Sequence, residues 1–210
     1  MTKLVLLAHE CVRFSRDMTD KEVRNLVKNE TKFSVRRLDN FTLISLNAVY
    51  RLLLKTPTSK SLALYSGAEY LSVELFQSVI KSMHDKEAIR PFDFIATVGN
   101  AANFYLAKEF NVKGPNIFIG ASQNIFLKNS LLAEIDLNLG HSQQAIIVIW
   151  LITEDEWLCH AFLIEQVEIE SLATKGKLFQ VKGAESVCVD DLLQKSIDIV
   201  CPVFLNTHFR

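Results

Sequence analysis

The chain has 210 residues with 23 basic and 24 acidic side chains, so its formal net charge is -1 at pH 7. So balanced a charge excludes binding to nucleic acid or to an anionic membrane surface by bulk charge. The length predicts a single domain over residues 1–210. Hydrophobic residues make up 49% of the chain and include 14 phenylalanines, which favours either a Phe-rich core or a buried partner surface.

The N-terminal apolar segment, residues 4–8, ends at His9 and is too short for a signal peptide, so it predicts a first strand. The longest apolar run covers residues 145–152, far below the roughly 20 that a membrane-spanning helix needs. We therefore expect a cytoplasmic protein without a membrane span. The cysteines lie far apart and without metal-ligand spacing, which predicts reduced thiols and neither a metal nor a cofactor: Cys11, Cys159, Cys188 and Cys201.

Helical and strand patterns alternate through the first half of the chain. Thr19 and Glu22 have the spacing of a capping box and predict a helix through about Lys28. Apolar residues then recur at helical spacing over residues 41–52, up to the Thr-Pro break at 56–57. Further along, the patterns predict a strand at 61–66 stopped by Gly67, a helix at 69–83 and a turn at 90–93.

The second half continues the alternation and ends on two strand-like runs. Residues 101–110 predict a helix, 116–119 a short apolar strand and 123–137 a further helix. Residues 145–152 and 157–164 are separated by four residues, three of them acidic, and predict a β-hairpin. The sequence thus predicts a layered α/β domain with a mixed sheet.

Two segments in the middle of the chain carry a resemblance to a known family. They are Thr97-Val98-Gly99-Asn100-Ala101-Ala102 and, further on, Gly114-Pro115-Asn116-Ile117-Phe118-Ile119-Gly120-Ala121-Ser122-Gln123. Their order and spacing resemble the β-ketoacyl synthases of the thiolase fold, where a Gly-Pro-Asn/Ser turn and a short apolar strand precede the nucleophilic cysteine. Arg36-Arg37-Leu38-Asp39-Asn40-Phe41 resembles a segment near the start of these enzymes. Residues 36–164 can thus be laid against the N-terminal half of a synthase.

The resemblance implies a subunit without the family's chemistry. Gln123 stands at the nucleophile position, and a glutamine amide cannot form the acyl-enzyme that a thiolate at a helix N-terminus forms. The family also uses two histidines from its C-terminal half, and none of the five histidines here lies in a segment resembling those motifs. For each histidine we expect a place on the surface or a satisfied place in the core.

The resemblance also implies a partner. Glutamine for cysteine is typical of the chain length factors that pair with type II ketosynthases, and the short ketosynthase-like subunits of aryl polyene pathways are the most similar subgroup. The implied partners are a full-length ketosynthase and, through that complex, an acyl carrier protein. The strand Ile117-Phe118-Ile119 is the expected seam, because an apolar strand edge invites pairing with another chain.

Two other functions stay open from the sequence. Ser122 lies in a degenerate form of the G-x-S-x-G elbow, and Asp190 or Asp191 with His208 would complete a hydrolase triad in chain order. Alternatively, the chain is a stand-alone module that docks onto an acyl carrier protein.

Overall fold

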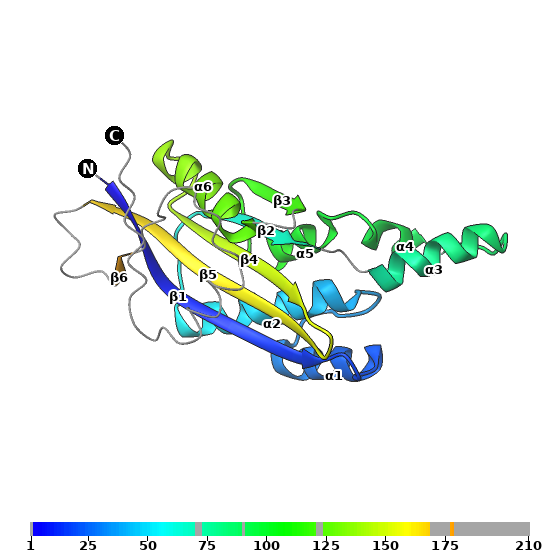
Figure 1. Cartoon of the computed structure of the whole chain (residues 1–210). Helices are drawn as coiled ribbons and strands as arrows, with labels where there is room; N and C mark the ends of the chain where they lie inside the picture. Colours follow the sequence, from blue (N-terminus) through cyan, green and yellow to red (C-terminus); the bar gives the residue numbers. More distant parts are fainter. Residues whose placement is uncertain (1, 70–72, 90, 121–123, 169–176, 179–210) are drawn as a thin grey trace.

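The structure of the chain is a computed structural model that describes residues 2–69, 73–89, 91–120, 124–168 and 177–178 (Figure 1). Within these residues helices and strands alternate, as the sequence predicts. In chain order they are β1 (Thr2–Ser15), α1 (Asp20–Thr31), α2 (Asn40–Lys55), β2 (Leu62–Ala68), α3 (Val73–His84), α4 (Pro91–Ala96), α5 (Ala101–Glu109), β3 (Asn116–Gly120), α6 (Ile125–Asn138), β4 (Gln144–Ile152), β5 (Glu156–Glu168) and β6 (Lys177–Leu178).

The strands form one mixed sheet in the order β3-β2-β4-β5-β1-β6. β2 runs parallel to both β3 and β4, whereas β4 and β5 form the predicted antiparallel hairpin, with Ile152 opposite Trp157. The first strand of the chain pairs with β5 along its whole length. The predicted α/β domain with a mixed sheet is confirmed.

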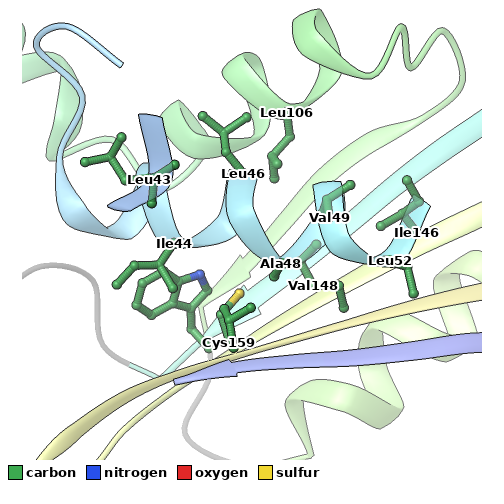
Figure 2. Close-up of a cluster of buried hydrophobic side chains, with 14 of the residues drawn as sticks. Leu43, Ile44, Leu46, Ala48, Val49, Leu52, Leu106, Ile146, Val148 and Cys159 are labelled. Carbon is green, nitrogen blue, oxygen red and sulfur yellow. The ribbon is translucent and has the colours of Figure 1, made fainter. Parts of the chain in front are cut away.

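One face of the sheet is covered by α1, α2 and α5. Figure 2 shows the side chains of α2 lying over those of β4 and β5, with Leu106 of α5 beside them. Leu43, Ile44, Val49 and Leu52 are fully buried there, because α2 presents apolar residues at helical spacing to the sheet. The capping box that starts α1 is also confirmed, since Glu22 accepts from the Thr19 N–H at 2.8 Å.

The opposite face is covered by α6 alone among the described elements (Figure 1). Phe126, Ala133 and Leu137 of this helix pack on Tyr65 and other side chains of the sheet. The outward side of α6 also carries exposed apolar residues, which recur every four positions at Leu131, Ile135 and the C-cap Leu139. The helix therefore has apolar side chains on two sides.

The predicted first strand is too short. Instead of ending before His9, β1 continues to Ser15, because its polar residues find partners on both faces of the sheet. Glu10 forms an ion pair with Lys55 of α2 on one face, while His9 contacts the ring of Phe162 on the other. Successive side chains of a strand point to opposite faces of the sheet, so polar residues that find partners on both faces allow the strand to continue.

Two predicted interruptions are also wrong. Gly67 does not end β2 but lies within it, where the strand meets α6. The predicted turn at residues 90–93 is in its described part the start of α4, since Pro91 is the first helical residue and its fixed φ suits that position.

Gly67 sets the distance between β2 and α6. A Cβ atom at this position would lie 2.7 Å from Nδ2 of Asn129 and 2.8 Å from Cγ2 of Ile125. We expect Gly67→Ala to lower the free energy of unfolding by about 1–3 kcal/mol, because the helix would have to move off the strand. Gly120→Ala is the matched control, since its nearest neighbour lies 3.9 Å away. Urea unfolding measures both, and equal stabilities would contradict this account of Gly67.

Candidate functional site

The sequence segments that carry the family resemblance meet around β3. Asn103 of α5 accepts from the Ser66 hydroxyl of β2 at 2.5 Å and donates from Nδ2 to the Ile117 carbonyl of β3 at 3.1 Å. This fully buried amide therefore joins α5 to two neighbouring strands. The start of α5 is held beside β3 by these contacts.

Phe118 fills the space that the glycine of the first segment leaves open. A Cβ atom on Gly99 would lie 2.7 Å from the Phe118 ring, so only glycine permits this contact. Phe41, from the third segment, meets the other side of the same region, with its ring centroid 6.4 Å from that of Phe118. Three segments that are separate in the sequence thus converge on one side chain.

The three residues of the expected seam have different surroundings. β3 is the end strand of the sheet, so one of its edges has no strand beside it among the described residues. Ile117 packs against the α6 side of the sheet and Phe118 against the side of α2 and α5. Ile119 belongs to neither cluster of buried side chains in the described part of the chain.

The connection from β3 to α6 is where the resemblance places the nucleophile. Gln123 and Ser122 lie outside the described residues, as do Asp190, Asp191 and His208 of the alternative triad. The residue that precedes α6, Asn124, has a left-handed backbone with φ 56° and makes no side-chain cap. Asparagine tolerates this conformation better than other residues with a side chain except aspartate, so the chain turns sharply into the helix there.

A cluster of polar side chains near the start of α6 was not predicted. Nε2 of His9 and Nδ1 of His160 are 3.0 Å apart, and Sγ of Cys11 lies 3.6 Å from Nε2 of His160. The Phe162 ring stacks on His9 at 4.5 Å and meets Phe126 of α6 at 4.7 Å. One aromatic side chain therefore separates the histidine pair from the first turn of α6.

The groups of this cluster are held in their neutral forms. Burial, together with the charges of His9 and Arg13, lowers the pKa of His160 to about 3. Burial likewise raises the pKa of the Cys11 thiol, because a thiolate loses its hydration there. The hydrogen bonds can be made with all three residues neutral, so the cluster lacks the thiolate–imidazolium pair of a reactive cysteine.

The described residues offer no group of three or more histidine, cysteine or acidic side chains placed to hold a metal ion. Cys11 and Cys159 are free thiols, and the other two cysteines lie outside the described residues. A search of the described helices for one long and apolar enough to cross a membrane finds none.

We expect the buried His160 to make the stability depend on pH. Because the folded pKa of His160 lies below the ordinary histidine value of 6.5, the unfolded chain takes up the proton first as the pH falls. The stabilisation is complete above pH 6.5 and is lost towards pH 3, by at most about 1.4 kcal/mol per pH unit for this group. His9, whose pKa burial also lowers, acts in the same direction.

Urea unfolding at a series of pH values from about 7 to about 4.5 measures this dependence. His160→Gln should flatten the slope, whereas His84→Gln, at an exposed position, should leave it unchanged. Identical slopes in the wild type and His160→Gln would contradict the assignment.

Comparison with known proteins adds the fold family. No protein-family model matches the sequence, and no curated protein matches it either. Solved structures do. A chain of the complex between a ketosynthase and its chain length factor from Xenorhabdus doucetiae has a TM-score of 0.61 at 14% identity, covering 80% of this chain and 80% of that chain.

Two further structures extend the comparison. The ishigamide ketosynthase/chain length factor matches with a TM-score of 0.61 and 14% identity over 80% of this chain and 63% of that one. An oxazolomycin ketosynthase domain from Streptomyces albus JA3453 has a TM-score of 0.61 and 10% identity over 85% of this chain and 44% of that one. This chain therefore spans less than two thirds of the length of these two. The chain has the α/β fold of the thiolase-like ketosynthases, as the motifs around β3 imply.

Proposed function

We propose that this chain is a non-catalytic, chain-length-factor-like subunit that pairs with a full-length β-ketoacyl synthase in fatty acid or polyketide biosynthesis of the aryl polyene type. The observation that carries the proposal is the fold, shared over 80% of both chains with a member of a complex between a ketosynthase and its chain length factor. Gln123, where the motifs of the resemblance require the nucleophile, supports the absence of catalysis. The whole chain, residues 1–210, acts as one domain of a cytoplasmic assembly that meets the acyl carrier protein through its partner.

No thiol in the described part of the chain replaces the missing nucleophile. Burial raises the pKa of Cys11 and, more strongly, that of the fully buried Cys159, so both thiols stay protonated near neutral pH. The neutral His160 beside Cys11 has too low a pKa to act as its base near neutral pH. Cys11, Cys159 and His160 therefore support the fold rather than a reaction.

The edge of β3 that has no described strand beside it supports the proposed pairing surface. An unpaired strand edge offers a row of backbone donors and acceptors to another chain. Exposed apolar side chains lie before and after this strand. Val98, in the turn before α5, and Phe104, on α5, are exposed by 54% and 62%, and Leu131 and Ile135 of α6 are exposed as well. Permanent interfaces commonly combine such apolar surface with strand pairing.

The isolated protein should not take an acyl group from an acyl carrier protein, because a glutamine amide is no nucleophile and the thiols of Cys11 and Cys159 are held protonated. Intact-protein mass spectrometry after incubation with acyl carrier protein measures this. A co-expressed full-length ketosynthase, which should gain the acyl mass, is the control. An adduct on the isolated chain would overturn the non-catalytic role.

The seam can be tested at Ile119, because this side chain packs in neither buried cluster and its loss should leave the fold intact. Ile119→Lys should abolish co-purification with the ketosynthase, since a lysine on a strand edge opposes pairing with another strand. Leu26→Lys, at a residue exposed by 51% on α1, is the matched control and should co-purify like the wild type. Retention of the complex by Ile119→Lys, with unfolding in urea unchanged, would show that β3 is not the seam.

A further inference from the structure

A cleft of about 640 Å³ opens between the start of α2, the β4–β5 hairpin and the arm formed by α3 and α4. Figure 1 shows that this arm extends away from the sheet. The cleft lies on the side of the sheet that carries α2, whereas α6 and the histidine cluster lie on the other. It is therefore separate from the histidine cluster, although Phe41 belongs both to its lining and to the contacts of Phe118.

Three carboxylates from three different elements line this cleft. Asp20 begins α1, Asp39 precedes α2 and Asp93 lies in α4. The ion pairs among the described residues involve none of them. One cationic side chain, Arg16, is part of the lining, and its guanidinium donates to the Thr153 carbonyl at 3.2 Å.

A buried acceptor in the same wall lacks a donor. Nδ2 of Asn40 donates to the Asp20 carboxylate at 2.7 Å, which fixes the orientation of the amide because a carboxylate can only accept. The amide oxygen, Oδ1, is then buried without a hydrogen-bond partner in the described part of the chain. Asp39, next to it, is half-buried, and its desolvation raises its pKa. A positively charged group in the cleft would stabilise the Asp39 carboxylate.

Aromatic side chains form another part of the lining. Phe41 stacks on Trp150 with ring centroids 4.3 Å apart, and Trp157 lies on the neighbouring strand. Aromatic rings attract ammonium and guanidinium groups through their negative faces, and carboxylates attract them by charge. We propose that this cleft binds an organic cation, an ammonium or guanidinium group, through Asp20, Asp39 and Asp93 beside these rings.

An anion fits the cleft less well, although two helices begin there. The N-terminus of a helix favours negative charge, but both starts already have their own acceptors. The Thr19 hydroxyl accepts from the N–H of Glu22 at 3.3 Å, and the Asp39 carboxylate accepts from the N–H of Thr42 at 3.3 Å. A bound anion would also lie close to three carboxylates with a single arginine to balance them.

Tryptophan fluorescence reads this cleft selectively, because the chain has two tryptophans and both line it. Agmatine, which carries an ammonium and a guanidinium group, is the probe, and inorganic phosphate is the anionic counterpart. We expect a saturable change in the emission of the full-length chain with agmatine and none with phosphate. A saturable change with phosphate alone, or no change with agmatine at millimolar concentrations, would overturn the proposal.

Substitutions of the carboxylates test the charge without disturbing the fold. Asp39→Asn keeps a residue that caps a helix equally well, and Asp93→Asn changes a residue inside α4. Each should weaken agmatine binding roughly two- to fivefold, and the double variant roughly tenfold. Asp85→Asn, at an exposed position outside the lining, is the control and should bind like the wild type. Unchanged affinity in the double variant would overturn the proposal even if agmatine binds.

A second experiment identifies the source of the cation. Calorimetric titration of agmatine into the complex with a co-expressed ketosynthase shows whether the cleft stays accessible. Loss of binding in the complex, with binding retained by the isolated chain, assigns the cleft to a lysine or arginine side chain of the partner. Retention of binding in the complex assigns it to a free small cation.

Discussion

The arrangement around β3 depends on the hydrogen bonds of one buried side chain, that of Asn103. Its amide is fully buried, accepts from the Ser66 hydroxyl of β2 and donates to the Ile117 carbonyl of β3, so it replaces water for both of these groups. A buried amide without these partners would be strongly destabilising, which ties α5 to one position on the sheet. Gly99 and Phe118 can then pack closely, and β3 is held at the end of the sheet with its outer edge free of any described strand.

The two faces of the sheet differ in how completely they are covered. Three helices cover the face that holds α2, and the side chains of α2 that meet the sheet there are fully buried. The other face has α6 alone among the described elements, and the outer side of that helix carries exposed leucine and isoleucine. A helix with apolar side chains on two sides is typical of an inner layer, which is consistent with a chain that completes its packing in an assembly.

The sequence predicts most of the fold and less of the candidate site. The capping box at Thr19 and Glu22, the hairpin and the mixed sheet follow from local patterns and are confirmed. The position of Gly67 inside β2 does not follow from a local pattern. A glycine after an apolar run suggests the end of a strand, whereas here it marks a close contact between the strand and α6. The cluster around His160 could not be predicted either. Alternation places His9 and Cys11 on one face of a strand, but the register that brings them to His160 joins residues about 150 positions apart and leaves no local signal.

The pairing of β1 with β5 also determines when the protein can fold during synthesis. This strand is synthesised long before its partner, because its ladder joins Thr2 to Glu168 and Ser15 to Glu156. At roughly 5–20 residues per second, β1 waits on the order of ten seconds or more for its partner. Contacts of such high sequence separation slow folding, because the chain must close a long loop before the ladder stabilises it. Throughout that interval the apolar N-terminal segment is a free strand, and binding by a chaperone would keep it from pairing with another nascent chain.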